Sequence, residues 1–308
     1  MRWIEVIINT PGEEIDARCE ELAALGAGGF VIENEEDFRE FLESNRQYWD
    51  YVDKELEESF SGLSRIKTYL ADDEEGRGVL RAIRERCGEV GVSFVEDSDW
   101  ENNWREYYKP IDVGEKLVVV PEWESVPEGG RLPLRLDPGL IFGTGSHATT
   151  RMCLAALEQY AAPGKRVLDL GCGSGILGIG ALVLGCESST GCDIDPKAPD
   201  VAMANAALNG IGAERFFVRA GDILSDSSLR AALGTGYDIV LANIVSDVII
   251  PLSAYVDAFL APGGVFITSG IIEGRQDEVA AAIRAAGFAI TAHRCEEEWH
   301  CFECVRAR

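Results

Sequence analysis

Short strand-like segments alternate with helical periodicities through the second half of the chain. The segments are four or five residues long and bounded by turn residues, and the stretches between them repeat apolar positions at helical spacing. This alternation predicts the α/β fold class, with a doubly wound parallel sheet. The strands are expected at Val167–Leu170, Ser189–Asp193, Phe216–Arg219, Ile239–Ala242 and Val265–Ser269.

Two further strand patterns follow near the C-terminal end, at Phe288–Arg294 and Trp299–Val305. The four residues between them leave no room for the crossover helix that a parallel connection needs. We therefore expect an antiparallel hairpin at the end of an otherwise parallel sheet.

The N-terminal third shows its own alternation of strand and helix patterns. It predicts a smaller α+β domain, which we assign to the ferredoxin-like type. Apolar residues between Phe38 and Leu56 recur at roughly helical intervals in an acidic stretch, and we expect them to be core. Strands are expected at Trp3–Asn9, Gly29–Glu33, Ile66–Leu70 and Val92–Val95, and helices at Glu13–Leu25 and Gly78–Cys87.

The length of 308 residues favours two domains over one. We assign residues 1–100 to the first domain, 101–120 to a linker and 121–308 to the second domain. The segment Trp100–Pro110 is aromatic and charged and ends in proline, so we expect it to join the two.

The chain is strongly acidic, with 53 Asp and Glu against 28 Lys and Arg and a net charge of −25. Residues 1–110 carry −15 of this charge and the remainder −10. Such a balance does not support binding to a phosphate backbone, so no nucleic-acid partner is expected. A basic partner is the electrostatic complement, and solubility alone is the other interpretation.

The chain holds no run of about 20 apolar residues and does not begin with a secretory pattern, so we expect a cytoplasmic protein without a membrane partner. Its nine cysteines, an odd number, fit reduced thiols better than a disulfide framework. Cys301 and Cys304 beside His300 invite a zinc interpretation. Residues three apart on a strand point to opposite faces, however, so no metal site is expected.

A glycine-rich turn follows the first strand of the second half. Asp169 ends the apolar part of that strand, and Gly171, Gly173 and Gly175 precede a segment with helical spacing. Glycines without Cβ atoms let backbone N–H groups approach a ligand closely, and strand-to-helix turns are where ligands of open α/β sheets bind. The turn therefore indicates a nucleotide-type cofactor, the alternative being tight packing of a helix on a strand.

The spacing of this turn separates two cofactor classes. Dinucleotide enzymes prefer G-x-G-x-x-G, whereas this chain has G-x-G-x-G. Asp193 ends the next strand, 18 residues after Gly175, where a carboxylate can accept hydrogen bonds from ribose hydroxyls. Asp195 is expected to cap the following helix, with Pro196 as its first residue.

A second informative run extends from Asp137 to Thr150, just before the first sheet strand. Its glycines, threonines and single histidine suggest a loop that folds over a ligand. We expect a helix from Thr150 to Tyr160, with the hydroxyl of Thr149 or Thr150 capping it or binding cofactor. His147 is either a proton acceptor or an orienter of the loop, and we prefer the second.

These motifs resemble the class I S-adenosylmethionine (SAM) methyltransferases and, within them, the ribosomal protein L11 methyltransferase family. The run from Asp137 to Thr150 is similar to the family pattern D-P-G-x-x-F-G-T-G-x-H-x-T-T, and Leu241–Ile244 fits a further motif at the end of a strand. Two departures are visible: Ala148 stands where proline is usual, and Val245–Ser246 where Leu-Ala is common.

The resemblance implies transfer of methyl groups from SAM to lysine side chains and the N-terminal amine of ribosomal protein L11. It favours Asn243 as the residue that orients the acceptor amine, and we hypothesise that the N-terminal domain docks L11. The residues that it assigns to the cofactor are Thr150, Gly171, Asp193, Asn243, Asp169, Gly173, Phe142 and Gly143. The alternatives are a methyltransferase of another protein or small amine, a SAM-binding module without catalysis and, less favoured, a dehydrogenase.

Overall fold

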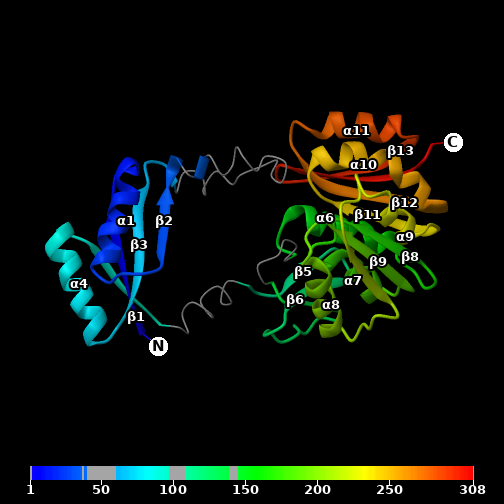
Figure 1. The fold of residues 1–308 in the computed structure, drawn as a ribbon. Coiled ribbons are helices and arrows are strands. Elements are labelled where there is room, and N and C mark those ends of the chain that lie inside the picture. The colour runs from blue at the N-terminus through cyan, green and yellow to red at the C-terminus, as the bar shows by residue number, and fades with distance from the viewer. Residues whose placement is uncertain (1, 37, 40–59, 97–107, 139–144, 308) are drawn as a thin grey trace. The chain divides into compact units, whose positions relative to one another are not determined.

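The computed structural model describes residues 2–36, 38–39, 60–96, 108–138 and 145–307 (Figure 1). It divides into two compact units, Met1–Tyr107 and Tyr108–Arg308, which are treated separately below. Most of the apolar stretch between Phe38 and Leu56, and Trp100 to Tyr107 of the expected connection, lie outside the described residues.

The smaller unit is an antiparallel sheet with strand order β2-β3-β1-β4. Alternate residues Ile4, Val6 and Ile8 of the first strand are buried and pack with Leu22 and Ile83 of the two helices. The α+β expectation is confirmed, and the ferredoxin-like type stays a prediction. The elements are β1 (Arg2–Asn9), η1 (Gly12–Glu14), α1 (Ile15–Ala24), β2 (Phe30–Asn34), β3 (Ser64–Ala71), α4 (Glu74–Cys87) and β4 (Gly91–Glu96).

The larger unit contains the expected doubly wound sheet, in the order β10-β9-β8-β11-β12-β14-β13. The strands from β10 to β12 pair in parallel, and β14 joins the sheet antiparallel to both β12 and β13. The predicted late hairpin is thus confirmed. The strands are β8 (Arg166–Leu170), β9 (Ser188–Asp193), β10 (Phe216–Ala220), β11 (Tyr237–Asn243), β12 (Leu260–Ile272), β13 (Phe288–Glu296) and β14 (Trp299–Arg306).

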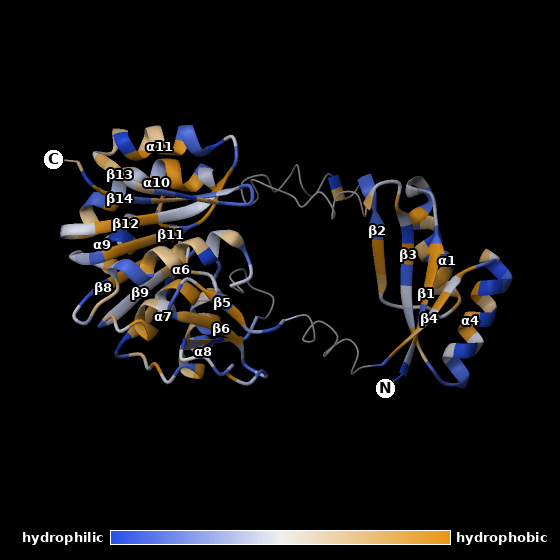
Figure 2. Cartoon of the chain, turned by 180° about the vertical axis from the view of Figure 1, so that it is seen from behind, coloured by the Kyte–Doolittle hydropathy of each residue, from blue (hydrophilic) through white to orange (hydrophobic). Residues whose placement is uncertain are grey.

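Helices cover both faces of this sheet (Figure 1). One core contains Val167 of β8 and the inner sides of α6, α7 and α8, and the other contains Leu168 and the inner sides of α9, α10 and α11. Successive residues of a strand therefore pack into opposite cores. Because both faces are covered, strands such as β11 are largely hydrophobic (Figure 2). The helices are α6 (Ala148–Tyr160), α7 (Ile176–Val183), α8 (Ala198–Leu208), α9 (Ser227–Leu233), α10 (Ser246–Phe259) and α11 (Gln276–Ala285).

Cys301 and Cys304 show the same division, because Cys301 lies in the core beneath α6 and Cys304 in the core on the other face. The two thiols therefore point to opposite sides of β14, as their spacing predicted. Within the described residues, no helix is long and apolar enough to cross a membrane.

A second, three-stranded sheet precedes α6 and occupies part of the stretch expected as linker. It consists of β5 (Ile111–Val113), β6 (Leu117–Pro121) and β7 (Leu132–Leu136). Strand β6 is buried along its whole length, and its alternate residues Leu117 and Val119 pack in the same core as the first helix of the larger unit. The Glu158 carboxylate of α6 accepts hydrogen bonds from the backbone N–H groups of Glu115 (2.9 Å) and Lys116 (2.8 Å), which ties the β5–β6 turn to that helix.

Candidate functional site

The glycine-rich turn joins β8 to α7, with positive φ at Gly171 (75°), Gly173 (50°) and Gly175 (80°). A Cβ atom on Gly171 would lie 2.2 Å from Cγ2 of Ile244, and one on Gly175 would lie 2.9 Å from Cβ of Ala202. Both conformation and space thus require glycine at these two positions. The close approach also places the start of the turn against the end of β11.

Asp193 lies at the end of β9 and contacts this turn directly. Its Oδ2 accepts a hydrogen bond from the Gly173 N–H (2.7 Å) and its Oδ1 accepts one from the Asp195 N–H (2.9 Å). The structure therefore brings together the glycine turn and the second acid, which are 20 residues apart in sequence. Asp193 is partly exposed, so its carboxylate is accessible to a ligand at the same edge of the sheet.

The expected start of the following helix was wrong by two residues. Helix α8 begins at Ala198, and Lys197 occupies the capping position instead of Asp195. The Asp195 carboxylate instead accepts a hydrogen bond from the Lys197 N–H (2.8 Å), which closes a local turn before the helix starts.

Asp169 lies beneath the turn, in the core that β8 shares with α6 and α7. It is fully buried, and its Oδ2 accepts a hydrogen bond from the Gly178 N–H (3.0 Å). Gly178 is the third residue of α7, whose capping residue Gly175 has no side chain to offer. Asp169 therefore caps α7 from the neighbouring strand, which satisfies one of the free N–H groups of a helix start.

The environment of Asp169 favours its neutral form. Its pKa is raised to about 7, chiefly by burial and in smaller part by the negative charge of Asp193, against the opposing effect of the Gly178 N–H. Its Oδ1 is buried and has no hydrogen-bond partner within the described part of the chain. Asp169 is thus a half-satisfied carboxyl group under the turn.

Thr150 and Asn243 meet at the same edge of the sheet, although 93 residues separate them. The Asn243 side chain, at the end of β11, donates its Nδ2–H to Oγ1 of Thr150 (3.3 Å), in the first turn of α6. Asn243 is partly exposed and Thr150 is buried. The next residue, Ile244, covers Gly171, so the turn, Thr150 and Asn243 form one cluster.

The capping of α6 differs from the expectation. The helix begins at Ala148, not Thr150, and its cap is His147, whose Nδ1 lies 3.4 Å from the Thr149 backbone N and 2.8 Å from the Thr149 hydroxyl. Burial lowers the pKa of His147, although Glu297 opposes that effect, so neutral imidazole is favoured as the acceptor. The ring packs edge-on against Trp299 at 4.8 Å. His147 thus has a positioning role at the start of α6.

Sequence reasoning missed Asn205, which connects the two motifs. It is buried on α8, where its Nδ2 donates to the Ser174 carbonyl oxygen (2.9 Å) and its Oδ1 accepts from the Asp137 N–H (2.9 Å). Four residues later, Asn209 binds both the N–H and the carbonyl oxygen of Arg135. The sequence feature that could have indicated these contacts is a pair of asparagines four residues apart, Asn205 in the alanine-rich α8 and Asn209 directly after its end.

Phe142 and Gly143 lie outside the described residues, so the structure does not place these two expected cofactor contacts. The described chain resumes at Gly145, whose positive φ of 84° and missing Cβ fit it closely against Val119.

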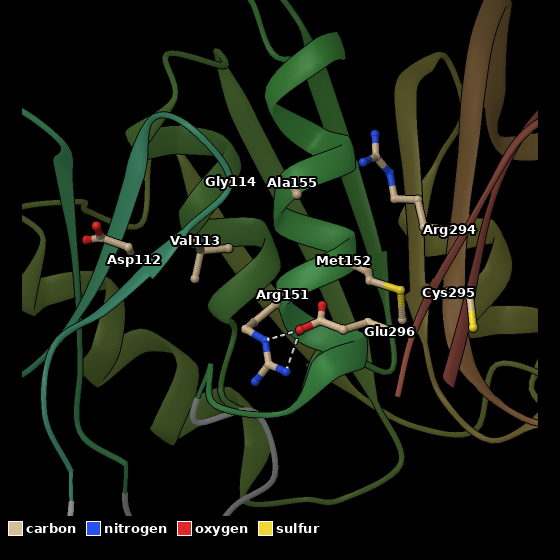
Figure 3. Close-up of a pocket in the computed structure, with 9 residues that line it drawn as sticks. All are labelled: Asp112, Val113, Gly114, Arg151, Met152, Ala155, Arg294, Cys295 and Glu296. Atoms are coloured by element: carbon tan, nitrogen blue, oxygen red, sulfur yellow. Dashed lines mark hydrogen bonds and ion pairs between the residues drawn. The ribbon is translucent and has the colours of Figure 1, made fainter. Parts of the chain in front are cut away.

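A pocket of about 350 Å³ opens on the outer side of α6, between the free edges of β5 and β13 (Figure 3). None of the expected site residues lines it. Arg151 and Glu296 form an ion pair at its mouth, with an Nη2 to Oε1 distance of 2.6 Å. Its lining residues are Asp112, Val113, Gly114, Arg151, Met152, Ala155, Arg294, Cys295 and Glu296.

The charges around the glycine turn fit a cationic nucleoside better than a dinucleotide. A pyrophosphate commonly binds the first N–H groups of the helix after such a turn. Here the Gly178 N–H is already bonded to the Asp169 carboxyl group, and Asp193 adds a second acid. A sulfonium is attracted by this arrangement and a pyrophosphate is repelled. The residues present therefore fit SAM.

Comparison with known proteins identifies the relatives of the chain. The model of the family described as ribosomal protein L11 methyltransferase (PrmA) matches residues 2–307. A protein of Heliobacterium modesticaldum named ribosomal protein L11 methyltransferase is 39% identical over 319 residues, which cover 100% of this chain and 98% of that protein. One of the same name from Thermoanaerobacter pseudethanolicus is 38% identical over 312 residues, which cover 97% of each.

A solved structure agrees with these relatives. The crystal structure of a ribosomal protein L11 methylase from Lactobacillus delbrueckii subsp. bulgaricus is 31% identical to the chain, with a TM-score of 0.59. The match covers 65% of this chain and 100% of that one.

Proposed function

The chain belongs to the ribosomal protein L11 methyltransferase family, and we propose that it transfers methyl groups from SAM to lysine and N-terminal amines of ribosomal protein L11. The observation that carries the site assignment is the convergence of the glycine turn, Asp193 and the Thr150–Asn243 pair at one edge of the sheet. Ligands of open α/β sheets bind at the carboxyl ends of strands.

We assign the cofactor contacts as follows. The Asp193 carboxylate accepts hydrogen bonds from the ribose hydroxyls, and the backbone at Gly171 and Gly173 contacts the methionine part. Thr150 and Asn243 close the opposite side. Asp169 holds the start of α7 through the Gly178 N–H. Phe142 and Gly143, which lie outside the described residues, keep their assignment to the cofactor from the family resemblance alone.

The reaction needs a neutral amine in line with the methyl group. SAM, when bound, supplies an electrophilic methyl group on a sulfonium. A free lysine has a pKa of about 10.4, so the site must favour its neutral form. The Asn243 side-chain oxygen makes no hydrogen bond to the described residues and can orient the amine nitrogen. Holding the two reactants in this alignment supplies much of the rate enhancement.

The acceptor assignment is supported by charge. The chain carries −25, of which residues 1–110 hold −15, and a basic ribosomal protein is its electrostatic complement. We propose that the N-terminal unit docks L11 and presents its amines to the site in the larger unit. Because all nine cysteines are free thiols, as a reducing compartment requires, we place the reaction in the cytoplasm.

Methyl transfer to purified L11 tests the proposed function. With methyl-labelled SAM, we expect label on L11, and mass spectrometry of its peptides is expected to place the label on lysine side chains and the N-terminal amine. Label only on another protein or a small amine would support a different methyltransferase. Tight binding of SAM without transfer to any acceptor would support a non-catalytic module, and nicotinamide binding tighter than SAM binding would revive the dehydrogenase.

Replacing Asn243 with alanine tests its role on the acceptor side. Loss of a hydrogen bond to a charged or reacting group costs about 1.5–3 kcal/mol, so we expect kcat to fall by about tenfold to a hundredfold. Steady-state kinetics with L11, together with the Kd of SAM from calorimetry, separate the two roles. A variant with normal kcat and weakened SAM binding would contradict the acceptor role and leave Asn243 as a cofactor contact alone.

A further inference from the structure

A buried carboxyl group lies beneath the site, where the cofactor assignment leaves it without a direct contact. Asp169 is 0% exposed, its Oδ2 is held by the Gly178 N–H at 3.0 Å, and its Oδ1 has no partner within the described residues. A buried polar atom without a hydrogen-bond partner lowers the stability of the fold, so its presence here suggests a function.

No positive charge compensates Asp169 in the part of the chain that the structure describes. The charged group that acts on it is Asp193 from β9, whose negative charge raises the pKa of Asp169. Asp169 in turn raises the pKa of three neighbouring thiols, Cys192 from β9, Cys172 from the turn and Cys153 from α6. Burial is the main cause of the raised pKa of Cys172 and Cys192, and a hydrogen bond with Cys301, followed by burial, is the main cause for Cys153, so all three thiols stay neutral. Among the described residues, the α7 N–H of Gly178 is the one favourable contact of the Asp169 carboxyl group, so its ionised form has no counter-charge there.

Asp169 is close to the place where the methyl group is to be transferred. Asp169 of β8 pairs with Leu241 of β11 in the sheet. Asn243 lies two residues after Leu241 on β11, which corresponds to about 7 Å along that strand. On the other side, Asp169 is near enough to Cys153 of α6 to raise the pKa of its thiol, and Thr150 lies about one helical turn before Cys153. The Thr150–Asn243 pair thus lies two residues nearer the carboxyl end of the sheet than the buried carboxyl group, on the same face.

We propose that Asp169 is a specificity-determining residue that distinguishes cationic SAM from its uncharged product by supplying the counter-charge of the sulfonium. Methyl transfer turns the sulfonium into the thioether of S-adenosylhomocysteine (SAH), which removes one positive charge from the cofactor. The ionised carboxylate therefore favours the substrate form and gains nothing from the product form. This inference rests on the proposed function, because it requires the cofactor to occupy the site.

The sign of the effect follows from linkage. In the ligand-free protein, burial raises the pKa of Asp169 to about 7, so near neutral pH about half of the molecules carry the proton. A sulfonium favours the ionised form and lowers this pKa, so SAM binding releases a proton and tightens as the pH rises through 7. SAH lacks the sulfonium and leaves the proton in place.

The expected size of this pH dependence can be calculated for a bound sulfonium that lowers the pKa of Asp169 by about one unit. The Kd of SAM then falls by about fivefold between pH 6 and pH 8, and binding at pH 7 releases about 0.4 proton. The Kd of SAH is expected to stay flat apart from titration of the amino group that both ligands carry. The preference for SAM over SAH should therefore increase with pH.

Calorimetry on the full-length protein measures this effect without a catalytic assay. Titrations of SAM and of SAH at pH 7, in buffers with different enthalpies of ionisation, give the number of protons released. The same titrations on Asp169→Asn show how much comes from this group, because the amide keeps the shape and the acceptor for Gly178 but does not titrate. Asp200→Asn is the matched control, since it removes an exposed carboxylate of α8.

We expect proton release with SAM but not with SAH in the wild type and in Asp200→Asn, and its loss in Asp169→Asn. Equal release with both ligands in the wild type would overturn the inference even if the variant fails to fold, a point that a thermal melt decides. Release that persists in a folded Asp169→Asn variant would overturn it as well. Absence of SAM binding by the wild type would instead refute the proposed function, and the inference with it.

Discussion

Replacing Gly171 with alanine is expected to lower the affinity for SAM by about a hundredfold or more. Two costs combine at this position. The residue has a φ of 75°, where a side chain costs about 1–2 kcal/mol. The new Cβ would also lie 2.2 Å from Cγ2 of Ile244, and relieving such a clash costs about 1–3 kcal/mol. The cofactor turn must therefore move away from the end of β11.

Gly164→Ala is the control that isolates the cost of placing a side chain at a positive φ. Gly164 has a φ of 80°, but a Cβ there would meet nothing within 4 Å. Calorimetric titration of SAM on both variants, with thermal melts to compare their stability, separates strain from displacement of the turn. Both variants should lose some stability, and Gly171→Ala alone should lose cofactor affinity. If a folded Gly171→Ala variant bound SAM as tightly as the wild type, the turn would not contact the cofactor.

Removal of residues 1–107 is expected to leave SAM binding unchanged and to reduce methylation of L11 by about 10²- to 10⁴-fold, the range over which a linked docking module raises the effective concentration of its target. The larger unit begins at Tyr108 and contains the complete seven-stranded sheet with a core on each face. The smaller unit has its own core, which includes Ile4, Val6 and Leu22. Within the described residues, each core is built from residues of one unit.

A short lysine-containing peptide, supplied at high concentration, provides the control for this truncation. Because such a peptide does not depend on docking, both forms of the protein should methylate it at similar rates. Rates on L11 and on the peptide, measured with labelled SAM, then distinguish lost docking from lost chemistry. Efficient methylation of L11 by the truncated protein would refute the recognition role of the N-terminal unit.

Local patterns were sufficient for the strands of the two larger sheets and for the glycine turn, but not for the short strands β5, β6 and β7. Val167 and Leu168 alternate between two cores, so a short apolar run was recognisable as a central strand. The positive φ of Gly171, Gly173 and Gly175 follows from their position between a strand and a helix. Asp193 was found because the unit of strand, helix and strand places its second strand beside the first, which brings the acid to Gly173.

Helix ends were less predictable, since neighbouring side chains compete to cap them. Thr149, Thr150 and His147 all offered an acceptor at the start of α6, and His147 took the position because Trp299 packs against its ring. Before α8, the Asp195 carboxylate accepts a hydrogen bond from the Lys197 N–H, and the helix begins only at Ala198. Such choices depend on contacts of distant residues or on small differences between local turns.

The amino-acid sequence by itself determined the strands of the two larger sheets, where the chain needs glycine and which acids follow the sheet strands, because these properties depend on side-chain periodicity and on backbone conformation over a few residues. The tertiary structure alone decided that Asn243 reaches Thr150, that Asn205 joins Ser174 to Asp137, and that Asp169 is fully buried with no counter-charge among the described residues. Those contacts depend on the order of strands in the sheet and on which helix covers which face, and the free energy of a buried charge depends on everything packed around it.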